Sequence, residues 1–291
     1  MPQIVKNRVK PIAEKLRENV DLINFLEDKD VQYLAIKKVL SSLRDLRKTS
    51  FIVVGVASVS YMLSLKGEEH WLSLSDYVES RKKHNPEEVL RGFVKESGSL
   101  ARFRSARLKR IDLLVRARPD FENKFDSFIG DLNELRRFLA HTLGAGLEDK
   151  TIVFSVKMFY YTLKAAGLYV SVPTDIPVPV DRRVALVSLT SGLLEYPALH
   201  YLKAANELRG RYSKLVREAW SKVCRLAGVP PLRVDSLLWI VGGFLEKSGF
   251  NYLRALQLIE DWLSSRLNSR WRGLIKELSY KLVETRRIHS L

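Results

Sequence analysis

Apolar residues recur at intervals of three and four along most of the chain, which is the spacing of amphipathic helices. This pattern predicts one or two helices over 19–43, a helical run over 125–143, and helices over 234–249 and 251–267. The longest apolar stretch, FIVVGVASVSYMLSL at 51–65, is 15 residues long and contains three serines. Because a bilayer span needs about 20 apolar residues, we interpret it as a core helix.

Alternating patterns typical of strands are scarce in the chain. The segment YVSVPTDIPVPV at 169–180 contains three prolines, which makes a central strand impossible and favours a stiff, extended connector. No repeats, low-complexity tails or long linkers interrupt the helical pattern. The sequence therefore predicts an all-α fold.

The composition indicates a large core and an anionic partner. Of 291 residues 46% are hydrophobic, and 49 Lys and Arg against 33 Asp and Glu give a net charge of +16. Such an excess favours nucleic acid first and an anionic membrane second. A charged, thermophile-like surface without a nucleic-acid role is the alternative.

The basic charge is densest at 102–119, RFRSARLKRIDLLVRARP, where seven Lys and Arg stand against Asp112 alone. A charge run of this kind is either a solvated helix face or a surface that contacts phosphates, and the sequence leaves both open.

The single cysteine, Cys224, excludes an intramolecular disulfide and any site that needs several cysteine ligands. Its neighbours suggest an inert thiol in a partly buried helix, and an intracellular location fits. Basic residues interrupt any apolar run at the start of the chain, so we expect no signal peptide; these are Lys6, Arg8, Lys10 and Lys15.

The histidines show no metal-ligand spacing, so we expect neither a metal nor an organic cofactor. His70 stands beside Trp71, and we interpret it as an ordinary surface histidine.

One predicted helix, within LEDKTIVFSVKMFYYTLKAAG at 147–167, carries lysines and aromatics on one side. At about 100° per residue a single narrow stripe contains Lys150, Phe154, Lys157, Tyr161 and Lys164. The opposite face is apolar and suits a core. We therefore expect the stripe to be surplus to packing and to suit a flat ligand attached to a phosphate backbone.

The loop LGAGLEDK at 143–150 joins this helix to the preceding one, which could make a helix–hairpin–helix over about 131–167. Gly144 and Gly146 let the main chain approach a phosphate closely, and the second helix adds its positive N-terminal dipole. An ordinary helical connection is the alternative.

Lys150 is expected at or near the start of the second helix, where the dipole disfavours the ammonium form and favours the nucleophilic amine. Asp149 opposes this effect. Asp181, in PVPVDRRVALVSL, precedes a new apolar-periodic run and occupies an N-cap position.

Two of these stretches, DKTIVFSVKM and PVPVD, resemble the archaeal GO glycosylase (AGOG) family, the 8-oxoguanine DNA glycosylases of the helix–hairpin–helix superfamily. Supporting matches extend from about Gln32 to Trp239, and the chain from about residue 255 is longer than the family pattern. The resemblance implies that Lys150 is the catalytic lysine and Asp181 the catalytic aspartate. It also implies a pocket in which two aromatics sandwich a flipped base, Phe154 and Trp239, and four further residues line it, Gln32, Trp71, Lys157 and Asp235.

The fold implied by this resemblance is one domain over 1–291 with two helical lobes, the middle of the chain forming one and the chain ends contributing to the other. The lesion pocket would lie in a cleft between them. The implied activity is excision of 8-oxoguanine from double- or single-stranded DNA by a monomer without a cofactor. Lys150 would form a Schiff base with the sugar, Asp181 would stabilise the developing positive charge, and β-elimination would follow.

Three alternatives remain from the sequence. A related glycosylase for another damaged base would share Lys150 and Asp181 and differ in its pocket. A basic helical protein that binds nucleic acid without chemistry would bind in a salt-dependent way and tolerate Lys150→Gln. A membrane-surface protein is the weakest, because the basic segments lack a matching aromatic face.

Overall fold

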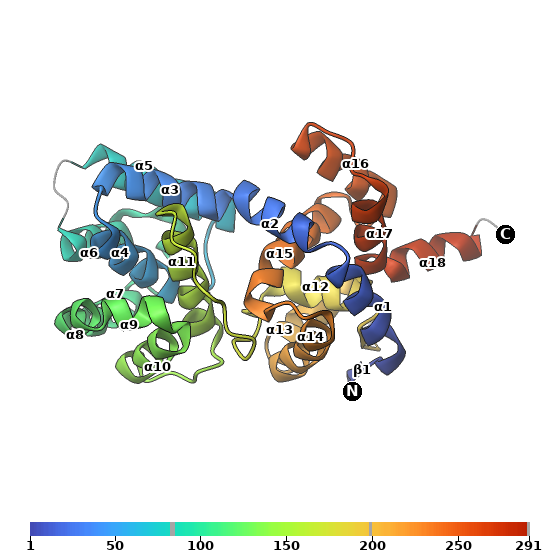
Figure 1. Ribbon diagram of the computed structural model, residues 1–291, viewed down its shortest axis with the longest axis horizontal. Coiled ribbons are helices and arrows are strands. Elements are labelled where there is room, and N and C mark those ends of the chain that lie inside the picture. The colour runs from blue at the N-terminus through green and yellow to red at the C-terminus, as the bar shows by residue number, and fades with distance from the viewer. Residues whose placement is uncertain (82–84, 198–199, 290–291) are drawn as a thin grey trace. The chain divides into compact units, whose positions relative to one another are not determined.

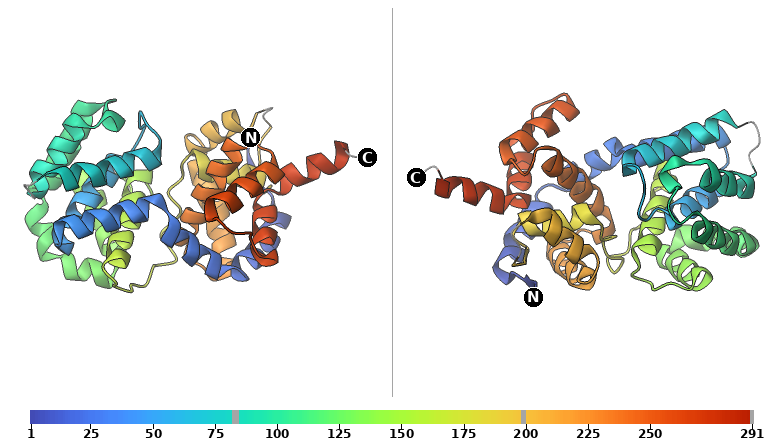
Figure 2. Two further views of the ribbon diagram at one scale, coloured as in Figure 1. Left: turned by 90° about the horizontal axis from the view of Figure 1, so that it is seen from above. Right: turned by 180° about the vertical axis from the view of Figure 1, so that it is seen from behind.

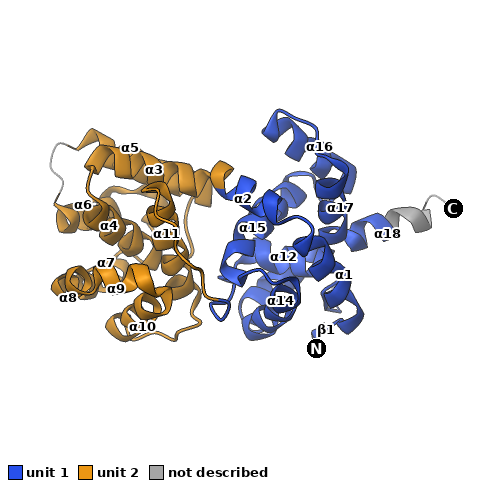
Figure 3. Ribbon diagram, in the orientation of Figure 1, with its two compact units in different colours: residues 1–27, 174–291 blue, residues 28–173 orange. Residues whose placement is uncertain are grey.

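The computed structural model describes residues 1–81, 85–197 and 200–289. The described residues form helices α1 to α18, one 3-10 turn and one two-stranded antiparallel sheet (Figure 1). The predicted all-α class is therefore confirmed. The chain divides into two compact units (Figure 3): unit 1 comprises residues 1–27 and 174–291, and unit 2 comprises residues 28–173.

Unit 2 is built around one long central helix. Its elements are α3 (Val31–Leu43), α4 (Leu46–Ser58), α5 (Gly67–Ser80), α6 (Pro86–Glu96), η1 (Gly98–Leu100), α7 (Arg104–Arg116), α8 (Arg118–Asn123), α9 (Phe125–Gly130), α10 (Leu132–Leu143) and α11 (Lys150–Ala165). Helix α11 packs against α3, α4 and α10, and every residue from Ile152 to Leu163 is buried. A helix surrounded in this way buries its polar side chains together with its apolar ones.

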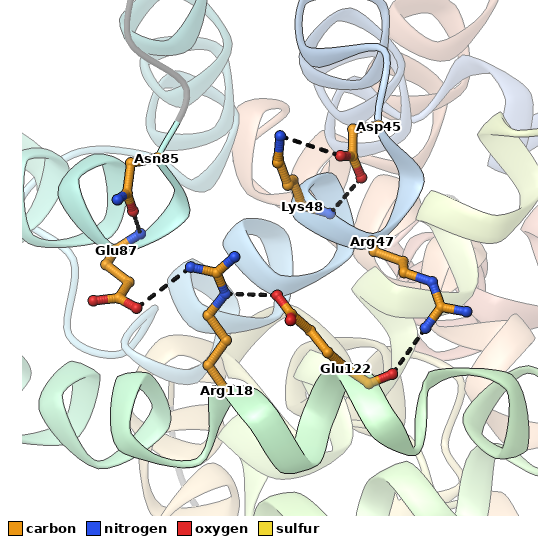
Figure 4. A network of polar contacts seen from close by, with 7 residues as sticks. All are labelled: Asp45, Arg47, Lys48, Asn85, Glu87, Arg118 and Glu122. Carbon is orange, nitrogen blue, oxygen red and sulfur yellow. Dashed lines mark hydrogen bonds and ion pairs between the residues drawn. The ribbon is translucent and has the colours of Figure 1, made fainter.

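Polar contacts connect helices α4, α6 and α8 of unit 2 (Figure 4). Arg118, at the start of α8, reaches Glu87 on α6 at 3.3 Å and Glu122 at 2.7 Å. Arg47 on α4 donates to the main-chain oxygen of Glu122 at 2.8 Å. Asn85 caps α6 through the Glu87 N–H at 2.9 Å. These contacts fix α4, α6 and α8 relative to one another within unit 2.

Unit 1 combines both ends of the chain. Its elements are β1 (Gln3–Ile4), α1 (Lys6–Arg17), α2 (Val20–Lys29, whose last two residues belong to unit 2), α12 (Arg182–Thr190), β2 (Leu194–Glu195), α13 (Tyr201–Arg209), α14 (Ser213–Ala227), α15 (Pro231–Lys247), α16 (Tyr252–Leu263), α17 (Ser269–Leu278) and α18 (Tyr280–His289). Helix α1 packs against α14 and α17, so the blue N-terminal helix lies beside helices of the C-terminal half (Figure 2). Helix α12 packs against α13 and α15.

Several predicted elements are confirmed with small differences. The 19–43 segment forms two helices, α2 and α3, and the proline segment at 169–180 contains neither helix nor strand. The 125–143 run is not continuous, because Asp131 is extended and its side chain accepts the Asn133 N–H at 2.8 Å to cap α10. The apolar stretch at 51–65 is helical only to Ser58, the last residue of α4.

Among the residues that the structure describes, no helix is long and apolar enough to cross a membrane.

Candidate active site

The turn between α10 and α11 is a short hairpin closed by its own side chains. Gly144 ends α10 in the left-handed conformation (φ +57°), which glycine adopts without strain. Asp149 precedes α11, and its carboxylate accepts the Gly146 N–H at 2.9 Å. The Gly144 N–H donates to the His141 main-chain oxygen at 3.3 Å. The N–H groups of both glycines are thus satisfied within the hairpin, although both residues are exposed.

Lys150 is the first residue of α11, as predicted, and it lies half-buried beside an aromatic ring. Its Nζ donates to the main-chain oxygen of Ser60 at 3.2 Å and lies 5.3 Å from the centroid of the Phe154 ring. Trp71 of α5 meets Phe154 edge to face, with ring centroids 6.1 Å apart. Unit 2 therefore brings together Lys150, Phe154 and Trp71, three of the residues that the sequence singled out.

Two more predicted residues, Gln32 and Lys157, lie together in the interior of unit 2. The Lys157 Nζ donates to the Gln32 Oε1 at 3.4 Å and pairs with the Asp30 carboxylate at 3.7 Å. Asp30 also accepts the Gln32 N–H and the Tyr161 hydroxyl, both at 2.9 Å. Burial raises the pKa of Asp30, while the charge of Lys157 and these hydrogen bonds act in the opposite direction.

This cluster corrects the expectation that the stripe on α11 is surplus to packing. Phe154, Lys157 and Tyr161 are all buried. Trp71 of α5 contacts Phe154, while Gln32 and Asp30 at the start of α3 bind Lys157 and Tyr161. Lys157 is buried, and its ion-pair partner Asp30 is the N-cap residue of α3.

In unit 1, Asp181 is the N-cap of α12, as predicted. It is extended and half-buried, and its carboxylate accepts the Val184 N–H at 2.9 Å. One carboxylate oxygen of Asp181 therefore caps α12, and the side chain adds negative charge at the positive end of this helix.

Asp235 and Trp239 lie one turn apart on α15, also in unit 1. Asp235 is buried and Trp239 is half-buried. The Arg183 guanidinium of α12 covers one side of the indole, with its carbon 4.1 Å from the ring centroid. Gly242 and Gly243 let α15 approach Arg183 closely, since a Cβ on Gly242 would stand 2.8 Å from the Arg183 Cβ.

The interpretation of His70 was wrong, and one basic residue differs from the segment around it. His70 is fully buried rather than at the surface, and its ring nitrogens bind the hydroxyls of Ser60 and Ser99. Arg107 departs from both interpretations of the basic 102–119 segment, which stay open for the other basic residues there. It is buried and donates to main-chain oxygens of Val59 and Leu100, among others.

Cys224 is buried in α14, where burial raises the pKa of the thiol, and this agrees with the predicted inert core cysteine. Within the described ranges, no group of three or more His, Cys, Asp or Glu side chains could hold a metal ion.

Sequence reasoning missed four residues that support the predicted ones: Asp30, Ser60, His70 as a buried group, and Arg183. Asp30 had a usable signal, because an aspartate just before an apolar-periodic run is a cap candidate. Ser60 acts through its main-chain oxygen, which no side-chain pattern reveals.

A helix, a hairpin with a left-handed glycine, and a second helix form a helix–hairpin–helix, and the second helix starts at Lys150 beside the Phe154 ring. The family model of AGOG, described as N-glycosylase/DNA lyase, matches residues 13–275, so the chain belongs to this family. The match runs to residue 275, so it includes part of the stretch from about residue 255 that was expected to be longer than the family pattern.

Individual relatives agree with this assignment. The N-glycosylase/DNA lyase of Pyrobaculum aerophilum is 31% identical over 239 residues, covering 81% of this chain and 87% of that protein. That of Methanopyrus kandleri is 34% identical over 218 residues, covering 72% and 79%. The crystal structure of the P. aerophilum 8-oxoguanine DNA glycosylase, Pa-AGOG, in complex with 8-oxoguanosine has a TM-score of 0.72 at 27% identity, covering 94% of this chain and 97% of that chain.

Proposed function

We propose that this N-glycosylase/DNA lyase excises 8-oxoguanine and that Lys150 is its nucleophile. The observation that carries the proposal is the position of Lys150 at the start of α11, with its amine beside Phe154 and bound to Ser60. The choice of lesion is supported by the similarity to the P. aerophilum enzyme, whose structure holds 8-oxoguanosine.

The lesion must leave the duplex before any side chain can reach the sugar. We assign Phe154 and Trp239 to stack on the two faces of the flipped base, with Trp71 supporting Phe154 edge to face. Stacking on Trp239 would use the side of the indole that Arg183 does not cover.

Recognition would depend on the hydrogen at N7, which 8-oxoguanine carries and guanine lacks. We assign the acceptor to Gln32, through its side-chain or main-chain oxygen. Asp235 would accept from the N–H edge of the purine, and Lys157 would hold the Gln32 amide in place through the 3.4 Å hydrogen bond.

The chemistry then proceeds by covalent catalysis. The Lys150 Nζ attacks the sugar C1′, the N-glycosidic bond breaks, and the base leaves with its bonding electrons and takes up a proton. Asp181 stabilises the positive charge that develops on the sugar. Opening of the sugar ring gives a Schiff base between Lys150 and C1′, and loss of a C2′ proton eliminates the 3′ phosphate and cuts the strand.

Binding to DNA would draw on the net charge of +16 and on the exposed hairpin at Gly144 and Gly146. Since the Gly144 and Gly146 N–H groups have partners within the chain, the hairpin would contribute close main-chain approach and the dipole of α11. We propose that a monomer acts on double- or single-stranded DNA, inside the cell at the nucleoid.

The test is a single-turnover assay on three duplexes that differ at one position: 8-oxoguanine, guanine, and 8-methoxyguanine, which keeps an 8-substituent but has no hydrogen on N7. We expect release of 8-oxoguanine with cleavage 3′ to the lesion, and little reaction with the other two. Equal cutting of 8-methoxyguanine would contradict the N7 role, and inertness toward 8-oxoguanine would contradict the proposed substrate.

A further inference from the structure

The turn that follows α4 presents four successive main-chain oxygens to two cationic side chains. Arg107 takes the oxygens of Val59, at 3.1 Å, and of Tyr61 and Met62. The oxygen between them, on Ser60, accepts from the Lys150 Nζ at 3.2 Å. With its neighbours held by a buried guanidinium, the Ser60 carbonyl has little freedom to turn away from Lys150.

The Ser60 side chain fixes the same turn through a chain of hydrogen bonds that ends in helix α4. Ser60 Oγ donates to the Val56 main-chain oxygen at 2.8 Å, so its only proton is used there. The 2.8 Å contact between Ser60 Oγ and His70 Nε2 therefore requires that Nε2 carries the hydrogen.

This tautomer also fixes the hydrogen bond on the other side of the neutral His70 ring. His70 Nδ1 must accept, and Ser99 Oγ donates to it at 2.6 Å. Ser99 Oγ then accepts from Ser97 Oγ at 2.7 Å. Each hydroxyl in this series donates one hydrogen bond. The donors follow one another from Ser97 through Ser99, His70 and Ser60 to the Val56 main-chain oxygen in α4.

The charge state of His70 agrees with this geometry. Burial, and then the nearby charges of Arg107 and Lys150, lower the pKa of His70 to about 3. His70 is therefore neutral at physiological pH and bound on both sides.

We propose that His70 is a positioning residue for Lys150: its neutral ring joins Ser99 to Ser60, fixes the turn after α4, and so holds the Ser60 carbonyl that orients the lysine amine. This inference depends on the proposed role of Lys150 as nucleophile. One N–H of the Lys150 side chain is directed to the Ser60 carbonyl, which limits the positions that Nζ can take.

Removing the ring would leave buried hydroxyls without partners and would let the turn relax. Since a displacement of about 1 Å at a reacting group can reduce a rate by about 10²-fold, the expected defect lies in the chemical step rather than in DNA binding.

The experiment compares His70→Leu, which has no polar group, with His70→Gln, which keeps a donor and an acceptor, and with Ser99→Ala. Ser248→Ala is the matched control, because Ser248 is a buried serine that bonds only its own helix, at 2.9 Å to Leu245. Three quantities are measured: the rate and the final amplitude of borohydride trapping on 8-oxoguanine DNA in single turnover, and the Kd for a duplex with a tetrahydrofuran abasic site.

We expect His70→Leu to trap about 10- to 100-fold more slowly, with full amplitude and an unchanged Kd. His70→Gln should recover part of the rate, Ser99→Ala should lie between, and Ser248→Ala should match the native protein. A lowered amplitude at the native rate would indicate partial unfolding and overturn the proposal, as would a native rate in folded His70→Leu.

Two further outcomes separate a folding defect of one variant from a failure of the proposed function. If His70→Leu does not fold, the trapping rates of His70→Gln and Ser99→Ala test the proposal. Native trapping rates in both variants would overturn it. If the native protein gives no adduct, or Lys150→Gln gives the native amount, the proposed function fails instead.

Discussion

The Nζ of Lys157 lies 3.7 Å from the Oδ2 of Asp30, and the two side chains are 1% and 0% exposed. The same carboxylate caps α3 by accepting the Gln32 N–H and binds the Tyr161 hydroxyl. One buried aspartate thus holds both the start of the helix that carries Gln32 and the lysine that contacts the Gln32 amide.

Asp30→Asn is predicted to destabilise the protein by about 3 kcal/mol, because it keeps a capping oxygen but removes the carboxylate charge that faces the buried Lys157 Nζ at 3.7 Å. The double variant Asp30→Asn/Lys157→Met should regain most of this free energy of unfolding, since it removes the buried charge as well. Urea denaturation measures both values. Equal stability of the single and double variants would contradict the predicted cost of burying Lys157 without the Asp30 charge.

The buried His70 predicts acid sensitivity. Its pKa is about 3 in the folded protein and near 6.5 when unfolded, so the unfolded chain binds the additional proton between these values. Native stability should therefore fall relative to His70→Gln as the pH drops below about 6.5, by at most about 1.4 kcal/mol per pH unit, down to about pH 3. Asp30, whose pKa is raised, acts in the opposite direction in both proteins and cancels in the difference. A pH-independent difference would contradict the neutral, buried ring.

Asp181 can be tested for charge and capping separately. Asparagine caps helices as well as aspartate does, so Asp181→Asn should change stability by less than about 0.5 kcal/mol while slowing base excision by roughly two orders of magnitude. Asp181→Ala should lose about 1 kcal/mol in addition, because the Val184 N–H loses its acceptor. Thermal unfolding and single-turnover excision give the two quantities. Native excision by Asp181→Asn would remove the carboxylate from the mechanism.

Gly242 is predicted to stabilise the close contact between α12 and α15, because it has no side chain there. An added Cβ would stand 2.8 Å from the Arg183 Cβ and 2.9 Å from its main-chain oxygen, so Gly242→Ala should cost about 1–3 kcal/mol. Gly273→Ala in α17 is the control, since nothing lies within 4 Å of its added Cβ, and it should gain up to about 1 kcal/mol. Similar melting temperatures for the two variants would argue against the close approach.

The helical elements could be predicted because each depends on its own residues. Apolar spacing gave α15 and α16, the aspartate before an apolar run gave the cap of α12, and the glycine turn placed Lys150 at the start of α11. The division at Asp131 was missed, since a cap inside an otherwise regular apolar pattern leaves the period unchanged.

Burial could not be predicted, because it depends on what packs against a helix. The period of α11 alone cannot show that the start of α3 contacts its lysine stripe. Lys157 was therefore expected to be surplus to packing, although its partner Asp30 lies far upstream in the sequence. His70 was noticed beside Trp71 and misjudged for the same reason, because its partners Ser60 and Ser99 come from two other segments.

The central claim is that Lys150 attacks the sugar. Its most direct test is borohydride trapping on a labelled duplex with one 8-oxoguanine, using the native protein, Lys150→Gln, and Lys164→Gln as a control from the far end of α11. We predict a covalent adduct with the native protein and with Lys164→Gln, and none with Lys150→Gln. An adduct of native yield with Lys150→Gln would place the nucleophile on another residue and contradict the account.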